Sequence, residues 1–137
     1  MEMNGSFKVD RSEFRRGEPV TVTLVLVNPT DRDLYLFVPR GPSSGLHLEV
    51  RQGGHRHVPD LTTEPEAGLI PEVRLSAGGA HRQVYLLTQW LRFEEPGACT
   101  VECTADIKVN EGSIRHRDGA GRSRIVPIST TLHLLVV

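Results

Sequence analysis

Apolar and polar residues alternate at every second position in short runs along most of the chain, which is the period of a β-strand with one buried face. One such run lies at 17–28, where one face is formed by Val20, Val22, Leu24 and Leu26. Its opposite face begins with threonines and ends with valines. We therefore expect a strand at the centre of a sheet, buried on one face where it begins and on both faces where it ends.

The same alternation recurs in shorter runs that are bounded by glycine, proline, asparagine or aspartate. We expect further strands at 6–10, 34–38, 46–51, 55–58, 70–75, 81–88, 96–106 and 125–137. Nowhere does a run of ten or more residues show helical spacing. Several strands are polar on one side, as the outer faces of packed sheets are. The pattern predicts an all-β fold, an antiparallel β-sandwich of eight to nine strands formed by a single domain over residues 1–137.

The alternation stops at 89–95, where three bulky apolar side chains stand close together. This spacing predicts a single helical turn that closes one end of the core. We expect Val22, Leu24, Leu48, Leu86, Trp90, Phe93 and Val101 to be largely buried.

The two cysteines, Cys99 and Cys103, fall on one face of the predicted strand 96–106. Four residues of extended chain separate them by roughly 13 Å, which is too far for a disulfide. No basic residue shares their face to lower a thiol pKa. We expect two reduced core thiols and a cytoplasmic protein, because the sequence also begins without the build of a signal peptide. Export with the signal removed is the alternative.

The features around the predicted plug resemble those of a known fold family. A β-branched strand ends in Asn28, the plug contains Trp90 and Phe93, and Pro96-Gly97 leads into an alternating strand. This arrangement resembles the immunoglobulin-like β-sandwich, and this style of strand entry is widespread in bacterial members of that class. The resemblance implies an immunoglobulin-like sandwich fold and says little about activity. Cys99 stands where the family usually has its corner tyrosine, so that corner hydrogen bond is not expected.

A second resemblance concerns the turn from Leu75 to Gly78 together with Trp90 and Pro96-Gly97. It is similar to the pattern of BsuPI-type intracellular proteinase inhibitors of bacteria. That resemblance implies a proteinase inhibitor whose exposed loop presents an arginine to its target.

Charge is nearly balanced over the chain, with 16 lysines and arginines against 17 acids and a net charge of −1. No global field therefore recruits nucleic acid or an anionic membrane. A local excess of positive charge lies in the polar hairpin tip at 114–124, which has a single acid, Asp118. The candidate partner-binding residues are Arg115, His116, Arg117, Arg122 and Arg124. The tip has no aromatic side chain to stack on a base, which favours a protein over nucleic acid, and a merely solvated hairpin is the alternative.

Metal and catalytic motifs are weak throughout. The only metal-ligand candidates are His55 and His57, with His47 and His81 expected nearby, and a metal site needs three or four convergent ligands. We expect exposed strand histidines and no metal. The sequence has no nucleophile elbow, P-loop or dinucleotide fingerprint. We therefore expect neither an enzyme nor a cofactor.

These observations favour a non-enzymatic interaction module that binds another protein through its end loops or a sheet edge. The first alternative is the BsuPI-like inhibitor with an arginine-rich loop, and the second is a metal-carrying sandwich that uses the histidines. We expect no membrane association. The partner and the oligomeric state are left open by the sequence.

Overall fold

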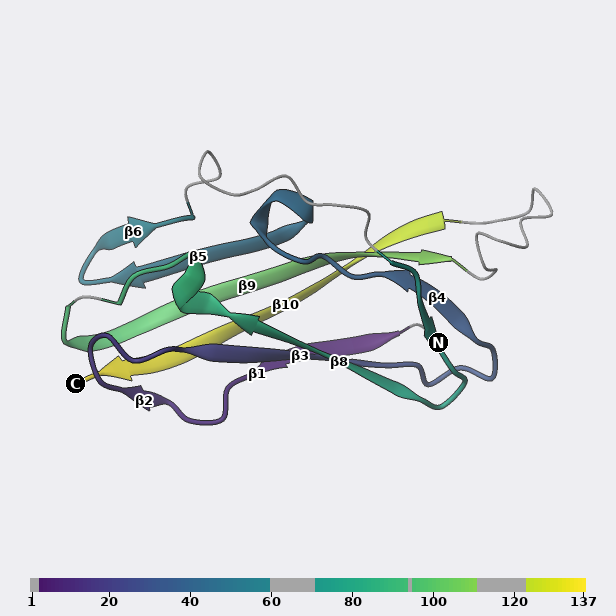
Figure 1. The fold of residues 1–137 in the computed structure, drawn as a ribbon, viewed down its shortest axis with the longest axis horizontal. Coiled ribbons are helices and arrows are strands. Elements are labelled where there is room, and N and C mark those ends of the chain that lie inside the picture. The colour runs from purple at the N-terminus through teal and green to yellow at the C-terminus, as the bar shows by residue number, and fades with distance from the viewer. Residues whose placement is uncertain (1–2, 60–70, 94, 111–122) are drawn as a thin grey trace.

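The computed structural model describes residues 3–59, 71–93, 95–110 and 123–137, and these form two β-sheets packed face to face (Figure 1). All nine predicted strands are present, and β2 is an addition. Within the described residues, no helix is long and apolar enough to cross a membrane. The strands are β1 (Asn4–Lys8), β2 (Glu13–Phe14), β3 (Thr21–Val27), β4 (Leu34–Phe37), β5 (Leu46–Gln52), β6 (His55–His57), β7 (Val73–Leu75), β8 (Ala80–Leu86), β9 (Gly97–Asn110) and β10 (Ser123–Val136).

The smaller sheet has the antiparallel order β1-β3-β8, so the predicted central strand is central. Val22, Leu24 and Leu26 point into the core and are at most 1% exposed. The prediction that β3 is also buried on its second face where it ends is wrong, because Val27 is 38% exposed. That face is the outer surface of a two-layer sandwich, where Val25 is half-buried and Val27 is exposed.

The larger sheet is organised around β9. Along one side β9 pairs with β10 over fourteen residues, from Gly97 opposite Val136 to Asn110 opposite Ser123. Its other side is shared, because β5 pairs with 100–105 and β4 pairs with 108–110. β7 then extends β4, β6 extends β5 and β2 adds to β10.

This pairing fixes which loops share an end of the sandwich. Tyr35 of β4 lies opposite Asn110, so the connection at 29–33 and the base of the last hairpin lie at the same end, as expected. The C-terminus lies at the other end (Figure 1). The hairpin tip itself, 111–122, and most of the acidic stretch 60–72 lie outside the described residues.

The core is closed at one end by the predicted plug. A 3-10 helix at Leu87–Gln89 begins two residues earlier than expected, and Leu91 and Phe93 are buried behind it. Trp90 was expected in the core and is half-buried, with its ring centroid 6.3 Å from that of Tyr85.

The inward face of β8 was predicted wrongly. Leu86 is 40% exposed and Val84 is 62% exposed, whereas Tyr85 and Leu87 are buried. Both faces of this strand become apolar in its second half, with Val84 and Leu86 on one and Tyr85 and Leu87 on the other, so the period alone does not choose between them. The side chain of Tyr85 sets which face points inward, because its hydroxyl donates a 2.5 Å hydrogen bond to the buried carbonyl oxygen of Pro39 across the sandwich.

Candidate functional site: the free edge of strand β8

Strand β8 forms one edge of the smaller sheet. It pairs with β3 over its whole length, from Leu86 opposite Thr21 to Ala80 opposite Val27. No other strand in the described part of the chain pairs with it. Its second side is therefore an edge of seven residues in regular register.

The ends of the ladder show which peptide groups face this edge. The Leu87 amide donates to the Val20 carbonyl at 2.8 Å, and the Asn28 amide donates to the Gly79 carbonyl at 3.0 Å. Hydrogen-bonded and non-hydrogen-bonded pairs alternate in an antiparallel ladder. The odd-numbered residues of β8 therefore direct their peptide groups to β3. The peptide groups that point to the free edge belong to Ala80, Arg82, Val84 and Leu86.

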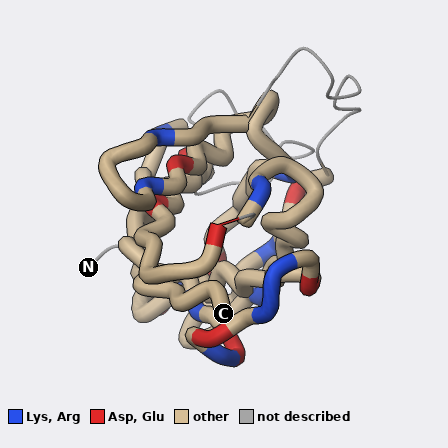
Figure 2. The backbone as a smooth tube through the Cα atoms, turned by 90° about the vertical axis from the view of Figure 1, so that its left-hand side faces the viewer, with Lys and Arg blue, Asp and Glu red and all other residues tan. Residues whose placement is uncertain are grey.

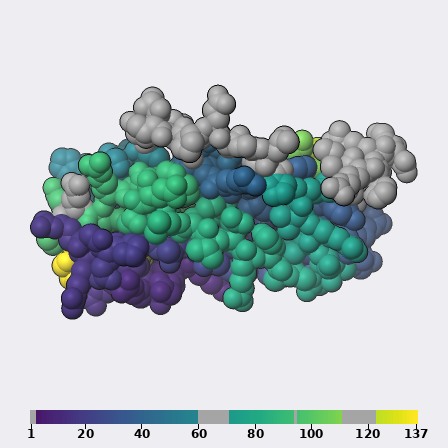
Figure 3. Space-filling view, viewed as in Figure 1, coloured from purple at the N-terminus to yellow at the C-terminus, as the bar shows by residue number. Residues whose placement is uncertain are grey.

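The side chains of those same four residues lie on the outer surface of the sheet, and all are exposed. Figure 3 shows β8, in teal, on the viewed face of the molecule. Val84, at 62% exposed, is the most exposed large apolar residue of the described chain, and Leu86 lies on the same face. The edge thus combines unpaired backbone groups with an exposed aliphatic pair.

The other sheet edges carry protection that β8 lacks. β6 and β7 are three residues long, and short edge strands offer little to a partner. The outer side of β1 is closed against β10, where the Phe7 amide donates to the Thr130 hydroxyl at 3.0 Å. β10 contains Pro127, which has no amide hydrogen to donate, and its end pairs with β2. Among the described strands, β8 is therefore the edge of seven residues that is neither closed against a neighbouring strand nor interrupted by proline.

The inner side of the same edge holds an unsatisfied polar atom. The Nε2 atom of His81 is buried and has no hydrogen-bond partner among the described residues. Gln83, next on that face, is half-buried. A buried imidazole nitrogen without a partner is unfavourable unless something else supplies one.

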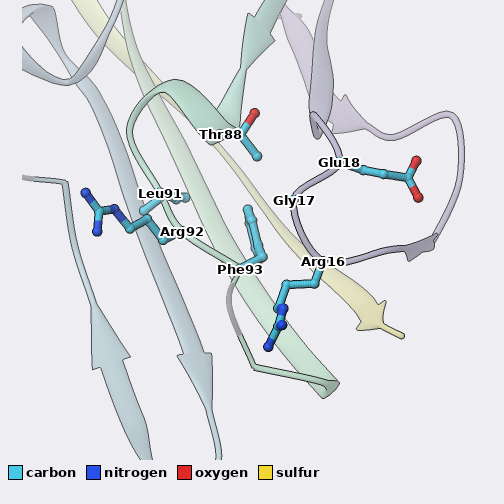
Figure 4. A pocket seen from close by; sticks show the side chains of 7 residues that line it. All are labelled: Arg16, Gly17, Glu18, Thr88, Leu91, Arg92 and Phe93. Carbon is cyan, nitrogen blue, oxygen red and sulfur yellow. The ribbon is translucent and has the colours of Figure 1, made fainter.

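A cleft lies elsewhere, between the turn before β3 and the plug (Figure 4). Its volume is about 530 Å³, and its lining is Arg16, Gly17, Glu18, Thr88, Leu91, Arg92 and Phe93. Glu18 accepts a hydrogen bond from the Arg15 amide and pairs with Arg11 at 2.8 Å; these two contacts lower the pKa of its carboxyl group. Figure 4 shows the Arg16 and Arg92 side chains extending in different directions. The lining contains no nucleophile paired with a base, so it supports no catalytic mechanism.

The histidines are not brought together. His55 and His57 are exposed on β6 and line a shallow pocket of about 230 Å³. His47 lies in the larger sheet, where its Nε2 is 2.8 Å from an oxygen of Asp106, while His81 belongs to the smaller sheet. The described residues contain no group of three or more His, Cys, Asp or Glu that could hold a metal ion.

The cysteines are free and buried, as expected. Burial raises the pKa of the Cys103 thiol to about 12, and it also raises the pKa of Cys99. Because the thiolate is the reactive form, neither residue is equipped to act as a nucleophile.

The arginine-rich tip is described only at its base. Arg115, His116, Arg117 and Arg122 lie outside the described residues, and Arg124 is half-buried in β10. The two strands are joined at the base by a 2.5 Å hydrogen bond from the Ser123 hydroxyl to the side-chain oxygen of Asn110. At the opposite end of the molecule, which Figure 2 views, basic and acidic residues are interspersed.

No model of a known protein family matches the chain, and no curated protein matches it in sequence. Among solved structures it is similar to Spo0M, a sporulation control protein from Bacillus subtilis, with a TM-score of 0.52 and 13% identity. That match covers 99% of this chain and 49% of Spo0M, so the chain spans about half of that protein's length. This likeness concerns the fold alone, and together with the two packed sheets it confirms the all-β, mostly antiparallel sandwich.

Two further structures are aligned with lower scores. A β-glucosidase from Listeria innocua has a TM-score of 0.46 and 13% identity, over 98% of this chain and 16% of the enzyme. A human CEP192 domain described as ASH/PapD-like has a TM-score of 0.39 and 12% identity, over 96% of this chain and 83% of that domain.

Proposed function

We propose that this chain is a non-enzymatic, immunoglobulin-like protein-binding module that accepts an extended segment of a partner protein along the free edge of β8. The observation that carries the proposal is the coincidence of two features on the same residues. Arg82, Val84 and Leu86 direct their peptide groups to the open edge and expose their side chains beside it.

Strand addition uses both features. Main-chain hydrogen bonds along the edge supply affinity, and side chains at alternate positions supply selectivity. A long, regular and apolar edge is otherwise a site of unwanted association, and proteins usually shorten, charge or cover such edges. The other described edges are short, closed against a neighbour or interrupted by proline, whereas β8 has only one charged residue, Arg82, and we attribute its openness to a partner.

The compartment belongs to the same proposal. Two buried free thiols are typical of proteins in a reducing environment. We place the module in the cytoplasm, with a cytoplasmic protein as its partner.

The test is a selection of extended peptides on the immobilised domain, followed by hydrogen exchange of the complex. We expect bound peptides to protect the amides of Arg82 and Val84. The variant Val84→Pro removes one edge-facing amide while leaving the ladder to β3 intact, and it should abolish binding.

The matched control is Val84→Thr, which keeps the amide and the β-branched shape and should bind within a few-fold of the native domain. The proposal fails if selected peptides bind Val84→Pro as well as the native protein, or if they protect amides of another element. Circular dichroism checks that both variants keep the fold.

A further inference from the structure

The smaller sheet differs in charge from the rest of the molecule. Its three strands are fully described and contain Lys8, Arg82 and His81 but no aspartate or glutamate. The chain as a whole has a net charge of −1, and the outer face of the larger sheet holds Glu49 and Glu102 directly opposite each other. The edge where a partner would add is therefore locally basic.

The register arranges the outer face of this sheet in rows. Val84 lies in line with Thr23 and Lys8, and Arg82 lies in line with Val25. A strand added beside β8 continues these rows, so its outward side chains stand next to Leu86, Val84 and Arg82 in turn.

We propose that the segment accepted by β8 is an extended, acidic stretch of a partner protein in which aliphatic and acidic side chains alternate on the outward face. The inference rests on the proposed function. Aliphatic side chains pack against Val84 and Leu86, and a carboxylate pairs with Arg82. Cross-strand pairs of opposite charge are favourable, whereas like charges directly opposite are unfavourable.

The inner side of the edge adds one further requirement. The residue of the added strand beside His81 lies next to an imidazole whose buried Nε2 atom has no partner among the described residues. A threonine or serine hydroxyl at that position can act as donor or acceptor and so serves either tautomer.

A second copy of this chain is the competing occupant. Its β8 would bring another Arg82 and another His81 to the interface and no carboxylate. Pairing of two identical basic edges lacks charge complementarity, which favours an acidic segment of a different protein.

The probe is a blocked nonapeptide with threonine at the odd positions and valine alternating with glutamate at the even positions. The matched control peptide has lysine in place of glutamate. We expect the acidic peptide to bind about threefold to tenfold tighter than the lysine peptide in a fluorescence titration. The difference should shrink at high salt and reverse in the variant Arg82→Glu.

The possible outcomes distinguish the preference for an acidic segment from the use of the β8 edge as a binding site. Equal binding of both peptides, lost in Val84→Pro, overturns the acidic preference and leaves the edge as the binding site. No binding of either peptide overturns the edge as well. A dimer in sedimentation that disappears in Val84→Pro identifies a second copy as the occupant and overturns the acidic segment.

Discussion

The side-chain amide of Asn28, at the end of the smaller sheet, donates a buried 3.1 Å hydrogen bond to the carbonyl oxygen of Leu75 in the larger sheet. The same amide group donates to the carbonyl of Arg32 at 2.7 Å, and its oxygen accepts from the amide of Thr30 at 3.1 Å. Asn28 is fully buried. One side chain thus satisfies the turn after β3 and joins the two sheets beside the start of β8.

Removing this amide should destabilise the domain. In Asn28→Ala the carbonyl of Leu75 and the amide of Thr30 lose a buried partner, and an unsatisfied buried polar group costs about 1–3 kcal/mol. We expect a loss of that size in the free energy of unfolding measured in urea. Asn4→Ala, an exposed asparagine of β1, is the matched control, with an expected change below about 0.5 kcal/mol. Equal effects of the two substitutions would contradict this role for Asn28.

The burial of alternate residues makes a second prediction. Leu24 is fully buried, so Leu24→Ala leaves a cavity and should cost about 2–5 kcal/mol. Leu86, on the outer face, should cost less than about 1 kcal/mol when changed to alanine. Urea unfolding of both variants checks the contrast, and a loss below about 0.5 kcal/mol for Leu24→Ala would show that the register of β3 is wrong.

The contrast between these leucines also shows what the sequence could determine. Alternation located all nine predicted strands, because a period of two survives even in short runs. It did not orient β8, where Val84 and Leu86 on one face compete with Tyr85 and Leu87 on the other. The choice came from tertiary contacts, namely the hydrogen bond of Tyr85 to Pro39 and the pairing with β3.

The sequence could predict the candidate binding edge only in part. A sheet edge was among the expected binding surfaces, but the strand that forms it depends on the order of strands in space, which local patterns do not encode. Two signals were present in the sequence: Val84 and Leu86 make the outward face of β8 apolar in its second half, and the strand has one charged residue, Arg82, and no proline. β2, with two residues, is too short to show any period.

The thiols should be reduced and slow to react. Both cysteines are free and buried, and the pKa of Cys103 is raised to about 12. We expect two thiols per chain on titration of unreduced, unfolded protein, and alkylation of the folded protein at neutral pH at a rate limited by unfolding. A titration that finds no thiol in a monomeric chain would mean that the two cysteines are bridged.

Burial of the thiols also predicts a loss of stability in alkali. The folded pKa of Cys103 lies above its ordinary value of 9.0, so the folded state holds the proton more tightly than the unfolded state. This contribution is complete below pH 9.0 and is lost as the pH rises toward about 12. We expect a decrease of about 2 kcal/mol by about pH 10.5, measured as a falling urea midpoint. The slope should be shallower in Cys103→Ala, and an unchanged slope would assign the effect to other groups.

The last prediction concerns the arginine-rich tip, which we propose as a second contact surface that steers an acidic partner toward the domain. Arg115, Arg117, Arg122 and Arg124 concentrate positive charge on a chain whose net charge is −1. Charges at the rim of an interface generally change association rates and salt dependence more than they change affinity. Changing all four arginines to serine should therefore slow association with a protein partner at low salt, while dissociation and the circular dichroism spectrum stay the same.

The matched control is the double variant Arg15→Ser with Arg16→Ser, which removes exposed arginines from the opposite end and should leave association unchanged. Equal association of the tip variant and the native domain at both low and moderate salt would reduce the tip to a solvated hairpin. Inhibition of trypsin by the native domain, lost in the tip variant, would instead favour the proteinase-inhibitor alternative.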